Sequence, residues 1–158
     1  MRDQLLEAWR TNNRISLYLL ERISDDGLAC TLSTRGGRDV ARQFAHLHDV
    51  RIWHLESRAK DLSAGLPKFG QKGSKRSPSR EELIEAMTAS GTAIETFLGD
   101  VFDSVPKRRG FKKGIFTTLS YFVAHESHHR GSILLTLKQC GHSLDADSRY
   151  AVWVWDQR

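Results

Sequence analysis

Residues 115–139, IFTTLSYFVAHESHHRGSILLTLKQ, form the stretch of sequence that decides the fold. Their apolar side chains recur at three- and four-residue steps, which places them on one face of a helix with 3.6 residues per turn. That face consists of Ile115, Leu119, Phe122, Val123, Ile133, Leu134 and Leu137. Gly141 follows at the position where a glycine commonly ends a helix. The stretch therefore predicts one long amphipathic helix that stops just before Gly141.

The same periodicity predicts three further helices. They cover residues 2–23, residues 38–62 and a segment that begins near Ser79, where Ser79 and Glu82 have capping-box spacing. Four long helices predict an all-α fold, a four-helix bundle of up-down type. The break at residues 63–78 is long enough to allow a crossover between the second and third helices. The tail, residues 142–158, could form a short strand, but no partner strand is evident, so we expect an extended strap across the bundle.

Composition bounds the class of protein. A chain of 158 residues with 39% hydrophobic and 27% charged residues is expected to form one globular domain over residues 1–158. No apolar stretch approaches the roughly 20 residues of a membrane-spanning helix, and the first ten residues do not resemble a secretory signal. Cys30 and Cys140 lie far apart and lack CxxC spacing, which excludes a cysteine-rich zinc site. We expect a cytoplasmic protein with reduced thiols that are not reactive.

Positive charge is concentrated in two loops. Residues 66–80 and 104–114 hold ten of the 24 basic residues and no acidic one, whereas the rest of the chain is acidic overall. Basic loops can attract anionic ligands, or they can simply be solvated. Few aromatic residues lie among these charges, which argues against nucleic-acid binding.

Histidine spacing carries the chemical signal. His125 and His129 are four residues apart, so they share one face of the predicted helix, on the flank of its apolar stripe. Two imidazoles at this spacing can bind one metal ion, although such a pair can also be a surface feature. His128 is expected to point to solvent. A third ligand is needed, and the helix over residues 38–62 offers His46 on a flank and His48 closer to the apolar stripe; helical phase does not choose between them.

The segment 125–129, HESHH, also reads HExxH, the zinc motif of metalloproteases in which the glutamate is the general base. Glu126 has the helical phase of the apolar stripe, which favours a structural role or a role supporting the metal ligands. A short helical chain also has little room for a peptide-binding cleft. Arg130 could contact an anion, but a salt bridge within the bundle is the interpretation we favour.

Residues 44–55, FAHLHDVRIWHL, and 125–142, HESHHRGSILLTLKQCGH, in that order on the second and fourth helices, resemble the DinB/YfiT-like family. The likeness covers most of the chain, and HxxHHRG is its most specific part. The resemblance implies a DinB-like four-helix bundle with a metal site of three histidines. It implies His125, His129 and a second-helix histidine as ligands. Phe44 and Arg51 align this last ligand with His46, and His48 is the alternative.

The resemblance also implies a range of functions. Some relatives are metal-dependent thiol S-transferases that use low-molecular-weight thiols, and some of these are isomerases. Three neutral imidazoles would leave a divalent ion its full charge and an open position for water or a thiol. We therefore expect Zn or Ni, a small electrophilic substrate and a transferase or hydrolase reaction; no side chain is assigned as the catalytic group. The alternative is a non-catalytic metal-binding or stress-related protein of the same fold. Relatives are often dimers, which implies a homodimer.

Overall fold

The computed structural model describes residues 1–70 and 76–157. Four long helices form a bundle, and they are α1 (Arg2–Arg22), α3 (Val40–Arg58), α4 (Arg80–Phe102) and α5 (Ile115–Gln139). Shorter elements are α2 (Asp25–Ala29), α6 (Ala146–Tyr150) and the 3-10 turns η1 (Lys60–Ser63), η2 (Ala151–Trp153) and η3 (Trp155–Gln157). The described residues contain no strand, so the predicted all-α class is confirmed. Within them, no helix is both long and apolar enough to cross a membrane.

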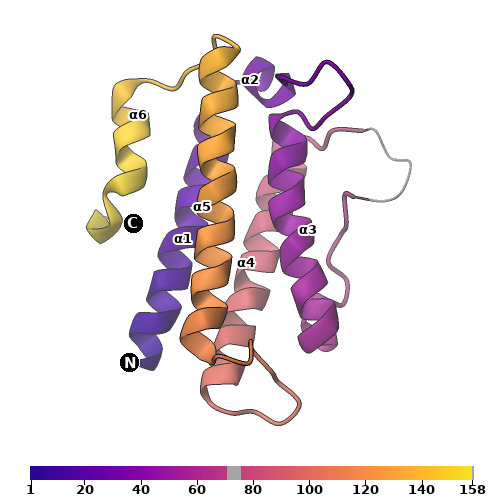
Figure 1. The fold of residues 1–158 in the computed structure, drawn as a ribbon, viewed down its shortest axis with the longest axis vertical. Coiled ribbons are helices and arrows are strands. Elements are labelled where there is room, and N and C mark those ends of the chain that lie inside the picture. Colours follow the sequence, from indigo (N-terminus) through magenta and orange to yellow (C-terminus); the bar gives the residue numbers. More distant parts are fainter. Residues whose placement is uncertain (71–75, 158) are drawn as a thin grey trace.

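The helices run in two parallel pairs, as Figure 1 shows. The start of α4 lies beside the end of α1, because the Arg80 guanidinium donates to the carbonyl of Leu20 and pairs with Asp25. The start of α3 lies there too, since Asp39 accepts a hydrogen bond from Ser77. α1 and α5 therefore run in one direction, while α3 and α4 run in the other. α3 ends and α4 begins at opposite ends of the bundle, so the chain crosses over between these two helices, as the length of this connection allowed (Figure 1).

Local sequence signals explain most helix ends. The Ser79 hydroxyl accepts from the Glu82 amide and the Glu82 carboxylate accepts from the Ser79 amide, which confirms the predicted capping box of α4. α5 covers the predicted residues 115–139, and Gly141 follows with φ of 80°, a left-handed conformation that favours glycine.

Two predicted elements are wrong in detail. The helix expected to reach residue 62 ends at Arg58, because Ala59 has φ of −158° and ψ of 57° and breaks the helical path. The tail is not extended: it forms α6 and two 3-10 turns beside α1 and α5. The N-terminal turn of α6 is stabilised by Asp145, whose side chain accepts from the Ser148 amide. The alternation of side chains in AVWVW therefore does not indicate a strand. It arises because one side of this segment is buried, as at Val152, and the other is exposed, as at Trp153.

The apolar core consists of two clusters. One is formed around Phe44, Met87 and Ile133, and the other around Trp9 and Phe122. All four long helices also carry buried polar residues at positions between those of the two clusters, namely Asn12, Ser16, Arg51, Ser90 and Glu126. A buried polar layer thus separates the two apolar clusters at the level of the histidines of α5.

Candidate metal centre

Three histidines from α3 and α5 lie together beside the polar layer. His125 and His129 are one turn apart on α5, and His46 approaches them from the second turn of α3. Ring centroids lie 5.6 Å apart for His46 and His125, 4.7 Å for His46 and His129, and 4.6 Å for His125 and His129. Each ring offers one nitrogen, and these three nitrogens lie within 4.8 Å of one another.

This arrangement fits a divalent metal ion. Zinc binds imidazole nitrogens at about 2.0–2.1 Å, so nitrogens that share one ion are at most about 4.2 Å apart. Small side-chain rotations would bring the three nitrogens within that limit. Among the described residues, neither a carboxylate nor a thiol belongs to the cluster.

The rings are also in the protonation state that metal binding needs. The pKa of His129 is lowered to about 4, chiefly by burial and in addition by the neighbouring rings of His125 and His46. Burial likewise lowers the pKa of His46 and of His125. All three imidazoles are therefore neutral near pH 7 and have a lone pair for a metal ion.

His48, the alternative third ligand, lies elsewhere. Its ring is buried, and Nδ1 lies 3.1 Å from the Ser90 hydroxyl while Nε2 lies 2.6 Å from the carbonyl oxygen of Pro67. Both ring nitrogens are thus engaged between α4 and the crossover connection. Because His48 lies two residues after His46, its side chain projects from the buried face of α3, whereas that of His46 projects from the flank.

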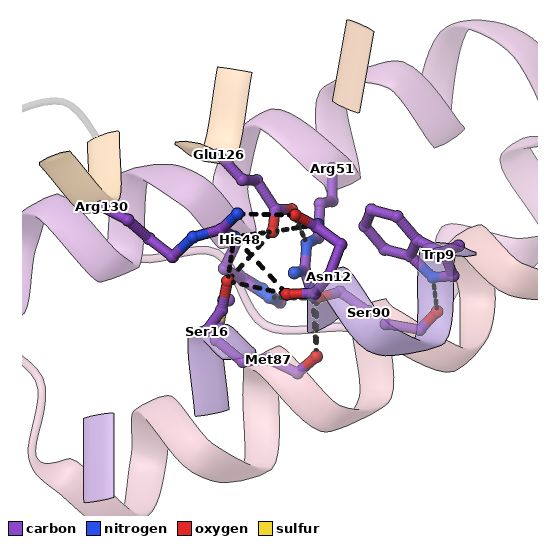
Figure 2. A network of polar contacts seen from close by, with 10 residues as sticks. Trp9, Asn12, Ser16, His48, Arg51, Met87, Ser90, Glu126 and Arg130 are labelled. Carbon is purple, nitrogen blue, oxygen red and sulfur yellow. Dashed lines mark hydrogen bonds and ion pairs between the residues drawn. The ribbon is translucent and has the colours of Figure 1, made fainter. Parts of the chain in front are cut away.

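The Glu126 side chain lies within the polar layer, among Asn12, Ser16 and Arg51 (Figure 2). One carboxylate oxygen accepts from Arg51 Nε at 2.7 Å, and the other accepts from Asn12 Nδ2 at 2.8 Å and from the Ser16 hydroxyl at 3.2 Å. Arg130 lies 3.6 Å from the second oxygen and also donates to Asn12 and Ser16. Glu126 is therefore an internal counter-ion, and the carboxylate is not placed as the general base of an HExxH protease.

The family follows from the comparison with known sequences. The model of the DinB family matches residues 1–153. The chain belongs to the DinB family. A search of curated proteins finds none that matches it.

In this DinB-family chain, aromatic residues lie beside His125 of the three-histidine cluster. The Tyr121 ring is nearly parallel to that of His125, with centroids 5.8 Å apart and an angle of 11°. Phe111, from the basic loop 104–114, packs on Tyr121 at 5.0 Å. His54 packs on Tyr121 at 4.9 Å, and no described residue pairs with its buried Nε2 atom. Tyr121 therefore restricts the rotation of the His125 ring.

The remaining candidates do not join the cluster. His128 is exposed, as its helical phase predicts. Cys30 and Cys140 are free, partly buried cysteines. Burial, followed by the influence of the neighbouring Cys140 thiol, raises the pKa of Cys30 to about 11, so its reactive thiolate form is scarce near pH 7.

Two features of the site were not predicted from the sequence. Arg51 was used only to align His46, yet its side chain is 1% exposed and holds Glu126. The sequence does contain a sign of this ion pair: Arg51 and Glu126 have opposite charges, and the helical periodicity places each of them on the buried face of its helix. Tyr121 was not singled out, although it precedes His125 by one helical turn, a spacing that places the two rings on the same face.

Proposed function

We propose that this DinB-family protein is a metal-dependent enzyme in which His46, His125 and His129 bind one divalent cation. Zinc and nickel are the first candidates, because both accept imidazole ligands. The reaction is the transfer of a low-molecular-weight thiol to a small electrophile, or the hydrolysis of such a molecule. The single observation that supports this proposal is the convergence of three neutral imidazoles from two helices.

The donor set favours catalysis over a structural role. Structural zinc sites are commonly closed by four protein ligands, whereas catalytic sites have three and leave a position open. When bound, such a cation lowers the pKa of a coordinated water or thiol and so supplies a nucleophile near neutral pH.

The protein's own residues hold this geometry. The half-buried histidine rings are reachable from solvent, while Tyr121 restricts His125. The Arg51–Glu126 ion pair connects α3 to α5, the two helices that carry the ligands. The distance between His46 and the α5 histidines therefore depends on this pair.

The experiment is a thiol-conjugation and ester-hydrolysis screen with zinc- or nickel-loaded protein. Wild type is compared with the double variant His125→Ala, His129→Ala and with His128→Ala, a matched exposed histidine of the same helix. We expect turnover that needs the metal, disappears in the double variant and persists in His128→Ala. Metal binding without turnover by any substrate would indicate the non-catalytic metal-binding alternative, and full turnover by the double variant would refute the site.

A further inference from the structure

A cavity of about 230 Å³ adjoins the three-histidine cluster on the α3 side. Its walls are the first turns of α3 and the described part of the crossover connection, and they include Arg38, Arg42, His46, Asp49 and Arg76. Liquid water occupies about 30 Å³ per molecule, so the cavity has room for a small organic group. His46 belongs to both the cavity and the cluster, so a molecule in the cavity reaches the metal centre.

Two of the charged residues in the cavity wall are already paired. The carboxylate of Asp49 accepts hydrogen bonds from the Phe69 and Gly70 amides, at 3.0 and 2.7 Å. Arg76 donates to both oxygens of Glu82, at 2.9 and 2.7 Å. These contacts attach the crossover connection to α3 and α4. The Arg76–Glu82 pair is neutral as a whole, whereas the Asp49 carboxylate is bonded to neutral amides and keeps its negative charge.

Arg38 and Arg42 are different. No residue within 1–70 or 76–157 forms an ion pair or hydrogen bond with either guanidinium group. Arg38 lines the same cavity as the ligand His46. Two guanidinium groups without an ion-pair partner among these residues thus line the cavity against one carboxylate, that of Asp49, so the cavity beside a centre that would hold a cation is positively charged.

Such charges oppose cation binding by Coulomb repulsion unless an anion lies between them. Arginine is also the side chain best suited to bind carboxylate or phosphate groups, through paired N–H donors. We propose that Arg38 and Arg42 form a subsite for the acidic group of the substrate, whose reactive end reaches the centre at His46. This inference rests on the proposed function and adds to it the substrate class: a small molecule with a carboxylate or phosphate group a few bonds from its thiol or electrophilic atom.

The test uses binding to cobalt-loaded protein. Two thiols of equal length, 3-mercaptopropionate and 3-mercapto-1-propanol, are titrated while the sulfur-to-cobalt absorption is recorded. Hydrogen bonds between charged groups favour the acid, so we expect it to bind about tenfold more tightly than the alcohol. In the double variant Arg38→Gln, Arg42→Gln this preference should disappear, with binding of the alcohol unchanged. Arg35→Gln, an exposed arginine of the neighbouring loop outside the cavity, is the matched control and should keep the preference.

The outcomes separate the two proposals. Equal binding of both thiols by wild type, or an unchanged preference in the double variant, would overturn the subsite and leave the metal centre standing. Failure of wild type to retain cobalt would overturn the proposed function and the subsite with it. The cobalt spectrum before thiol addition shows whether the double variant keeps an intact centre. Competition by acetate and by inorganic phosphate then identifies which acidic group the subsite prefers.

Discussion

Replacing Glu126 with Gln tests whether this residue stabilises the fold or acts as a base in an HExxH site. The substitution preserves shape and removes one negative charge. Arg51, 1% exposed, would lose its only ionic partner among the described residues, and Arg130, 8% exposed, would lose its ion pair with Glu126. The variant therefore leaves two buried guanidinium groups without a counter-ion.

Breaking a buried ion pair on one side costs about 3–5 kcal/mol, whereas domains of this kind are stable by about 5–15 kcal/mol. We expect Glu126→Gln to lower the free energy of unfolding by about 3–5 kcal/mol. In urea, with a slope of about 2 kcal/mol per molar, the midpoint would fall by about 2 M. Unfolding is followed by circular dichroism and tryptophan fluorescence.

Glu56→Gln is the matched control, because Glu56 pairs with Lys68 at the surface and both side chains are at least 40% exposed. Exposed pairs contribute about 0–1 kcal/mol, so this variant should unfold almost as wild type does. If Glu126→Gln were as stable as Glu56→Gln, the internal counter-ion role would be refuted. Restored stability in a variant that also replaces Arg51 with Met would support that role.

Two further predictions concern stability. Because burial lowers the pKa of His54 to about 4, the unfolded chain binds more protons than the folded chain between about pH 6.5 and pH 4, so the free energy of unfolding falls as the pH falls through that window. His54→Phe should remove this titration, so the difference in free energy of unfolding between the variant and wild type should shift in favour of the variant by about 2 kcal/mol from pH 7 to pH 4.5; a difference that does not change with pH in denaturant titrations would contradict it. Ser79→Ala removes the hydroxyl that caps α4 and should lower the free energy of unfolding by about 1 kcal/mol in the same assay, and an unchanged midpoint would show that the capping box contributes nothing.

The features that the sequence predicted are those encoded locally. The bounds of α5 follow from an apolar period and a left-handed Gly141, and the start of α4 follows from the Ser79–Glu82 spacing. The i, i+4 spacing of His125 and His129 likewise fixes their separation, whatever the rest of the chain does.

Features that depend on tertiary packing were not predictable in the same way. The choice between His46 and His48 depends on how α3 is rotated against its neighbours, which no local pattern specifies. The break at Ala59 and the helical turns of the tail also reflect packing that overrides local preference. The cavity beside His46 forms because Asp49 holds residues 69 and 70 across a long sequence separation, a contact with no signature in the sequence.

The most direct test of the metal centre is its stoichiometry. Wild type and the single variants His46→Ala, His125→Ala and His129→Ala are dialysed against zinc at pH 7 and analysed for metal, with His48→Asn and His128→Ala as controls. The proposed centre predicts one tightly held ion per chain in wild type and in both controls, and a loss of affinity in each of the three ligand variants. One ion per chain in all three ligand variants, or in none of the proteins, would contradict it.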